Sequence, residues 1–193
     1  MRPRITLRAA VVGIALLEVG LLVGLAVYLA AGDRALVVAF PRREALRREA
    51  DPGLVIPVAG VRVEELRDTY GDARSGGRAH TGVDIFAATG TPVLAAAASV
   101  VVQHDSAGAG GIALYARGLD GRTVYYYAHL TGVRAGLKVG DLVRAGDTLG
   151  YVGSTGNVSG SPHLHFGIFT VTHPNRLVRS RELNPYPLLT ERG

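Results

Sequence analysis

The 193-residue sequence contains no cysteine. Thiolate metal sites, disulfide frameworks and cysteine nucleophiles are therefore excluded, and a metal ion would need nitrogen and oxygen ligands. The sequence also lacks a GxxxxGK[ST] motif, and no GxGxxG motif follows an expected strand, so a nucleotide-binding loop is not indicated. An HExxH motif is absent as well, which excludes the glutamate base of peptidases built on that motif.

Charged residues are scarce, at 19% of the sequence, whereas 48% is hydrophobic. Much of the apolar excess lies in residues 9–31, which carry a single charge, Glu18. At about 1.5 Å per residue this run is long enough to cross a hydrocarbon core of about 30 Å. We expect an uncleaved transmembrane anchor within residues 1–32. A cleaved signal peptide is the alternative, but its apolar core would be only about 7–15 residues long.

Positive charge is concentrated near the N-terminus. Residues 1–50 hold eight arginines and four acidic residues, whereas residues 51–193 carry a net charge of only +1. The C-terminal part therefore lacks the basic excess expected of a nucleic-acid-binding domain, and no nucleic-acid partner is expected. Residues 33–54 read as a basic juxtamembrane helix or linker. Because arginines flank both ends of the apolar run, charge alone does not orient it in a membrane.

From about residue 55 to residue 189 the sequence pattern changes to short β-prone runs separated by glycine-containing turns. This pattern predicts a mostly β domain built from antiparallel strands. One helix is expected, over residues 63–68. Strands are expected within residues 91–103, 112–116, 122–128 and 142–152, with a hairpin around Leu119-Asp120-Gly121.

Four of the six histidines lie in three polar stretches at or next to expected strands. In HTGVD, His80 and Asp84 are four residues apart, so their side chains share a face of either a helix or a strand. In YYYAHL, His129 ends an aromatic strand. In SPHLHF, His163 and His165 are two apart and share one face of a strand.

The other two histidines, His104 and His173, lie in turn-like surroundings, and we expect them at the surface. An isolated HxH pair is typical of the polar face of a surface strand, so the three stretches carry weight only together. A catalytic zinc ion takes three protein ligands and leaves one position open, and two histidines with one carboxylate meet that need. Additional histidines nearby suit acid–base work, because their pKa lies close to neutrality.

The blocks HTGVD, YAHL and GSTGNVSGSPHLHF resemble the signature blocks of the M23 family of zinc metallopeptidases, the LytM or lysostaphin type. The resemblance covers residues 55–189 and implies an antiparallel β-sheet M23 peptidase domain of the duplicated-hybrid-motif kind. It implies one Zn²⁺ per chain. By their positions in the family's motifs, His80, Asp84 and His165 are the expected metal ligands. His129 and His163 are the expected catalytic histidines, one on each side of the attacking water.

The resemblance also implies a function, namely a zinc-dependent endopeptidase that hydrolyses stem-peptide cross-links or bridges of bacterial peptidoglycan. That substrate would place the domain on the extracytoplasmic side of the cell membrane, behind a single-pass anchor. A tyrosine could assist at the oxyanion, and the sequence does not choose among four candidates: Tyr70, Tyr125, Tyr126 and Tyr127.

Three alternatives stay open at this point. The first is a non-catalytic or autoinhibited LytM-type module that activates another cell-wall hydrolase and has regulatory partners in the cell envelope. The second is a peptidase that acts on a protein. The third is a structural zinc site, which would need His129 or His163 as a fourth ligand.

Overall fold

The computed structural model describes residues 53–173 and 177–191. The expected anchor over residues 1–32 and most of the expected juxtamembrane segment over residues 33–54 lie outside this part, and both stay predictions. Within the part that the structure describes, no helix has the length and apolar character needed to cross a membrane.

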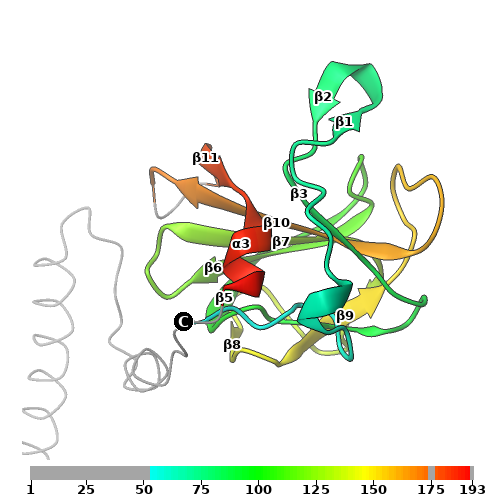
Figure 1. Cartoon of the computed structure of the whole chain (residues 1–193). Helices are drawn as coiled ribbons and strands as arrows, with labels where there is room; N and C mark the ends of the chain where they lie inside the picture. The colour runs from blue at the N-terminus through cyan, green and yellow to red at the C-terminus, as the bar shows by residue number, and fades with distance from the viewer. Residues whose placement is uncertain (1–52, 174–176, 192–193) are drawn as a thin grey trace, which may run out of the picture. The chain divides into compact units, whose positions relative to one another are not determined.

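A nine-stranded sheet dominates the domain, and every strand pairing in the described residues is antiparallel (Figure 1). Its main path runs β11-β10-β7-β6-β5-β8, with β3 paired to β10 and β9 paired to both β4 and β7. A separate two-stranded hairpin, β1–β2, projects from the sheet (Figure 1). The strands are β1 (Ala73–Arg74), β2 (Arg78–Ala79), β3 (Gly82–Phe86), β4 (Pro92–Leu94), β5 (Ser99–Ser106), β6 (Ile112–Gly118), β7 (Thr123–Val133), β8 (Leu142–Val143), β9 (Thr148–Val152), β10 (His163–Val171) and β11 (Arg179–Leu183).

The expected mostly β, antiparallel architecture is confirmed, including the hairpin that joins β6 to β7. The helix expected over residues 63–68 is wrong in length and type, because only a 3-10 turn, Val63–Glu65, forms there. The backbone becomes extended at Leu66, whose side chain is buried in the core, so tertiary packing outweighs local helix propensity. A short helix that was not expected, α3 (Pro185–Thr190), follows β11 and is capped by Asn184.

Strand β10 shows how the sheet separates the core from the polar site. Leu164, Phe166 and Ile168 alternate along it and are buried in the main hydrophobic core. Burial of each such side chain contributes roughly 1.5–3 kcal/mol. His163 and His165 occupy the intervening positions and therefore project from the opposite face. One strand thus supplies both core side chains and site side chains.

The two edges of β10 have different neighbours. Strand β7 pairs with residues 165–170 of β10, whereas β3 pairs with residues 163–167 and β11 with residues 168–171. The half of β10 that carries the two histidines is therefore held between β3 and β7. This arrangement places side chains from three strands around a common point.

Candidate metal centre and active site

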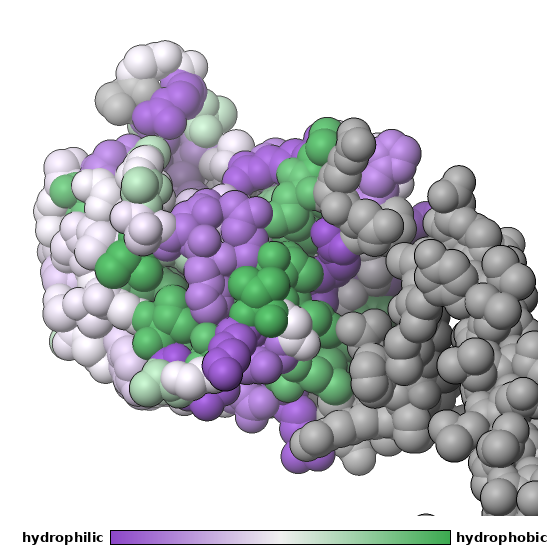
Figure 2. Space-filling model, turned by 180° about the vertical axis from the view of Figure 1, so that it is seen from behind, coloured by the Kyte–Doolittle hydropathy of each residue, from purple (hydrophilic) through white to green (hydrophobic). Residues whose placement is uncertain are grey.

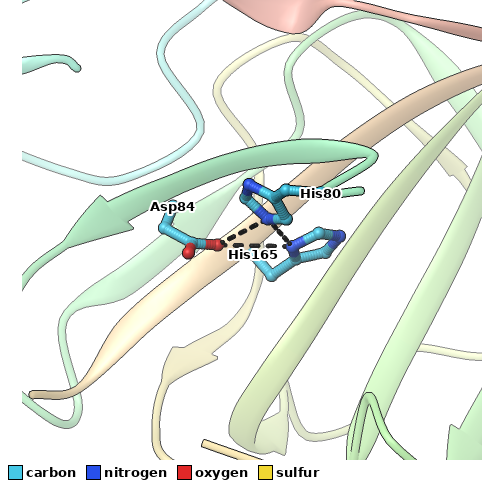
Figure 3. Close-up of side chains that lie close together, drawn as sticks. All are labelled: His80, Asp84 and His165. Atoms are coloured by element: carbon cyan, nitrogen blue, oxygen red, sulfur yellow. Dashed lines mark hydrogen bonds and ion pairs between the residues drawn. The ribbon is translucent and has the colours of Figure 1, made fainter. Parts of the chain in front are cut away.

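Side chains from β10, from β3 and from the residues just before β3 meet at the histidine-bearing end of β10 (Figure 3). In the sheet register His165 lies opposite Asp84. His80 ends the turn that enters β3 and points at the same place, as Figure 3 shows. The structure therefore brings together the three side chains expected to bind the metal: His80, Asp84 and His165.

The atoms of these three groups lie at, or a few tenths of an ångström inside, the separations that a tetrahedral ion requires. Nε2 of His80 lies 2.8 Å from Nδ1 of His165 and 3.0 Å from Oδ1 of Asp84. Nδ1 of His165 lies 3.3 Å from the same oxygen. Zinc bonds of about 2.0–2.1 Å in tetrahedral geometry separate ligand atoms by about 3.3 Å. Two nitrogens and one carboxylate oxygen at these distances fit a zinc ion with an open fourth position.

Hydrogen bonds to the backbone fix how the histidines present their nitrogens. Nδ1 of His80 donates to the carbonyl of Thr69 at 2.6 Å, so Nε2 carries the lone pair toward the cluster. His165 is turned the other way and presents Nδ1. Asp84 is held by its own backbone N–H, which donates to the hydroxyl of Thr69 at 2.9 Å.

Burial and neighbouring charges favour the protonation states that a metal needs. Burial raises the pKa of the Asp84 carboxyl, but the close contacts with the rings of His165 and His80 outweigh it and hold the pKa well below its usual range. Burial lowers the pKa of His165. The carboxylate is therefore ionised and the imidazole neutral at neutral pH, as metal ligands must be.

His129 and His163 lie beside this set with their rings 5.1 Å apart. Nδ1 of His129 donates to the carbonyl of Thr155 at 2.8 Å, and Nδ1 of His163 donates to the carbonyl of Ser161 at 3.0 Å. Both therefore present an unprotonated Nε2, and that of His163 lies 3.7 Å from Oδ1 of Asp84. Burial lowers the pKa of His129, which keeps it in the basic form at neutral pH.

His129 has an unusual backbone conformation. It lies inside β7 rather than at the end of a strand, and its φ of +64° is the only positive value among the described non-glycine residues. The pairing of β6 with β7 shifts register at this point. Such a bulge re-aims one side chain out of the regular alternation, and here it directs the imidazole toward His163 and His165.

Of the four candidate tyrosines, Tyr126 lines the groove beside the metal set, and its ring meets that of His165 edge-on at 5.7 Å. Tyr127 faces the core, as the strand alternation requires, and its hydroxyl accepts a hydrogen bond from the backbone N–H of Ala96. Tyr125 is also buried in the core, and Tyr70 does not line the groove.

The groove has a volume of about 810 Å³ and takes its walls from three loops as well as the strands. All four histidines of the three stretches line it. Its further lining residues are Ala73, Arg74, Arg78, Ala79, Thr81, Ala109, Gly110, Ala128, Asn157, Val158, Ser159 and Arg179.

Sequence reasoning missed two features of this groove. Arg74 reaches from the β1–β2 hairpin to Oδ2 of Asp84, the oxygen that faces away from the histidines. Residues 157–159 form part of the wall, although the sequence analysis gave them no role beyond their place in the block GSTGNVSGSPHLHF. Arg74 carries no sequence signal, because an arginine in a glycine-rich turn is ordinarily a solvated residue.

The remaining two histidines differ from each other. His173 is exposed in a bend, as expected. The expectation for His104 is wrong, because it lies half-buried within β5, and its Nε2 is buried without a hydrogen-bond partner. The pairing of β5 with β6 continues to Ser106, so it includes His104, which lies opposite Leu114.

The antiparallel β-sheet thus carries a His-Asp-His set that could hold a metal ion, with two further histidines beside it. The model of peptidase family M23 matches residues 78–180, which is more than half of the chain. The chain belongs to this family.

The curated relatives are peptidases. The L-Ala--D-Glu endopeptidase of Bacillus subtilis is 40% identical over 111 residues, which are 53% of this chain and 34% of the relative. Lysostaphin of Staphylococcus staphylolyticus is 38% identical over 120 residues, which are 61% of this chain and 23% of the relative. The chain thus spans about a third or less of the length of these relatives.

Among solved structures, the catalytic domain of lysostaphin from Staphylococcus simulans is similar, with a TM-score of 0.58 and 34% identity. The match covers 67% of this chain and 96% of that domain. The likeness therefore extends across nearly the whole catalytic domain of the relative.

Proposed function

We propose that this chain is a zinc-dependent endopeptidase that hydrolyses peptide cross-links or bridges of bacterial peptidoglycan. The observation that carries the proposal is the convergence of all five side chains at one point, with three of them spaced for a tetrahedral ion. Membership of the M23 family and the peptidoglycan-directed names among the relatives support the substrate.

In this proposal His80, Asp84 and His165 hold the ion. When bound, zinc supplies a Lewis acid for the scissile carbonyl and lowers the pKa of water. The three ligands use Nε2, Oδ1 and Nδ1, respectively, and the fourth side of the set opens into the groove.

The two further histidines move the protons. Each donates its Nδ1–H to a backbone carbonyl, so each has Nε2 available to accept a proton from the attacking water. The imidazolium formed in that step then donates to the developing oxyanion and returns a proton to the leaving amine. The edge-on packing of the rings of His129 and His163 keeps both groups beside the same reacting atom.

Two features of the sequence complete the proposal. Residues 9–31 would anchor the chain in the cell membrane, and the peptidase domain, which we place within residues 55–189, would lie on the extracytoplasmic side where its substrate is. Cell-envelope regulators remain candidate partners under the alternative in which the domain activates another hydrolase.

The full-length chain, purified in detergent and loaded with zinc, tests the proposal on purified peptidoglycan, with and without a chelator. Mass spectrometry of the released fragments would give the new amino terminus and so identify the bond. Chelator-sensitive cleavage is the expected result. Zinc-loaded, folded protein that releases no fragment would instead favour a regulatory module or a protein substrate.

A further inference from the structure

The lining of the groove beside the metal set holds more basic than acidic side chains, although Arg74 is paired with Asp84 and Arg179 with Glu182. Its described lining includes three arginines, Arg74, Arg78 and Arg179, but one acidic residue, Asp84. That aspartate is already engaged by histidines and by Arg74, so it offers little to neutralise the walls. A bound divalent cation would add to the positive potential. A cleft lined by one sign of charge concentrates ligands of the opposite sign.

Arg74 places one positive charge directly beside the metal set. It stands on the β1–β2 hairpin, which protrudes from the domain and carries strongly hydrophilic residues just below its tip (Figure 2). One guanidinium nitrogen contacts Asp84, while 39% of the side chain remains exposed. A guanidinium has five N–H donors, so this contact leaves donors directed at the groove.

Arg179, at the start of β11, provides a second and more rigid cationic position. Its Cζ lies 4.5 Å from the ring centre of Phe169 and 5.6 Å from that of Tyr126, and Nη1 donates to Glu182 at 2.8 Å. Stacking on two rings fixes the planar group and lowers the entropy that it loses when it binds a ligand.

A single aromatic ring, that of Tyr126, separates Arg179 from the metal set. Its centre is 5.6 Å from Cζ of Arg179 and 5.7 Å from the imidazole of His165. Arg179 therefore lies no farther from His165 than about three residues of an extended peptide would reach. The two arginines therefore mark one position at the scissile bond and another a few residues along the same groove.

We propose that the groove selects acidic peptides, with Arg74 binding a carboxylate next to the scissile bond and Arg179 binding one within about three residues of it. The inference rests on the proposed peptidase function and specifies its substrate. Guanidinium–carboxylate pairs form strong, charge-assisted hydrogen bonds. A neutral peptide, such as a glycine bridge, would strip water from the guanidinium groups without replacing those bonds, so it would bind less well.

Chemical amidation provides the test, because it removes carboxylate charge and leaves every peptide bond in place. One peptidoglycan preparation keeps its free carboxyl groups, and a matched preparation is converted to amides with carbodiimide and ammonia. The zinc-loaded, full-length wild type should cleave the native preparation about 10-fold faster than the amidated one. It should cleave a pentaglycine peptide more slowly than the native preparation.

Arg179 is the position to change, because it does not touch the metal ligands. In Arg179→Gln the native-to-amidated ratio should fall by about 3-fold or more, and Arg179→Lys should restore part of it. Arg144→Gln removes the same charge from an exposed turn outside the groove and should keep the wild-type ratio. A structural defect would lower both rates together and leave their ratio unchanged.

Binding separates this inference from the proposed function. Protein that sediments with native but not with amidated peptidoglycan, and cleaves neither, would retain the acidic preference and overturn the catalysis. Equal cleavage of both preparations, or faster cleavage of pentaglycine, would overturn the acidic preference and leave the peptidase standing. Equal sedimentation with both and no cleavage would overturn both.

Discussion

Gly82 lies against the imidazole of His165 so closely that a Cβ atom at position 82 would stand 2.9 Å from Cε1 and 3.0 Å from Nε2 of the ring. The same Cβ would lie 2.5 Å from the carbonyl oxygen of Phe166, which is backbone and has no means of rotating away. Only the hydrogen atom of a glycine fits at position 82. It leaves the ring of His165 the space to point Nδ1 toward Asp84 and His80.

Replacing Gly82 by alanine should displace the imidazole and weaken metal binding. The expected result is a zinc content well below one per chain, with a loss of stability of about 1–3 kcal/mol from overpacking. Gly167→Ala is the matched control, because Gly167 pairs with Gly82 in the sheet but its Cβ would make only ordinary contacts of 3.5 Å or more. Metal analysis and thermal unfolding of both variants decide the matter. Full zinc occupancy in Gly82→Ala would contradict the proposed role of the glycine.

Removing His80 and removing His129 should have separable effects. His80→Ala is expected to lose zinc, because it deletes one of three ligands. His129→Ala should retain zinc while turnover falls by about 10²–10⁴-fold, the usual contribution of a general acid–base group. The exposed His173 provides a control, and His173→Ala should change neither quantity. Zinc retained in His80→Ala, or turnover kept in His129→Ala, would show that these roles are misassigned.

Thr155 holds the loop whose carbonyl fixes His129. Its hydroxyl donates to the carbonyl of Leu130 at 2.8 Å and accepts from the backbone N–H of Ile112 at 2.9 Å. Thr155→Val keeps the shape but leaves both backbone groups unpaired, at an expected cost of about 1–3 kcal/mol.

Turnover of Thr155→Val should fall as well, because the carbonyl of residue 155 no longer holds Nδ1 of His129 in place. Denaturant unfolding and kinetics would measure the two effects. Thr131→Val, at an exposed position on β7, should behave as wild type. A Thr155→Val variant with unchanged kcat would mean that the loop is positioned by other contacts.

The β6–β7 hairpin should make a pH-dependent contribution to stability through Asp120. Its carboxylate accepts from the backbone N–H groups of Arg122 and Thr123 and from the Thr123 hydroxyl. Burial raises the pKa of Asp120, but these hydrogen bonds outweigh it and lower the pKa. The stabilisation is therefore fully present above the unfolded-state pKa of about 3.9 and is lost as the pH falls through the folded value.

In Asp120→Asn the charge-assisted part of these hydrogen bonds is missing at every pH. The difference in melting temperature between wild type and variant should be largest near neutral pH and should shrink below about pH 4. Both proteins share the metal site, so its own acid sensitivity cancels in the difference. If the difference in melting temperature between wild type and variant stayed constant down to pH 2.5, Asp120 would have an ordinary pKa in the folded protein.

Sequence patterns predicted the central strands of the sheet, but not the β1–β2 hairpin or β11, and the motifs named the five side chains that the structure brings together in the groove. The alternation in β10 places His163 and His165 on one face and Leu164 and Phe166 on the other, and a period of two is legible without a structure. The four-residue offset of His80 and Asp84 is equally local. Each of these inferences depends on neighbours within a few residues along the chain.

Features that depend on contacts between distant parts of the chain could not be predicted from the sequence. The positive φ of His129 arises where β6 and β7 shift register, and nothing in the letters YYYAHL marks that bulge. Arg74 contacts Asp84 only because the β1–β2 hairpin folds back over that residue. Leu66 ends a helix-forming stretch early because the core outweighs local propensity.

The hydrogen bonds that hold three of the site histidines end on the backbone, and this limits what substitutions can change. Carbonyl oxygens of Thr69, Thr155 and Ser161, rather than side chains, fix the tautomers of His80, His129 and His163. A main-chain oxygen survives any point substitution that preserves the loop path. The loops around the groove can therefore change their side chains without altering which ring nitrogen of each histidine carries the proton.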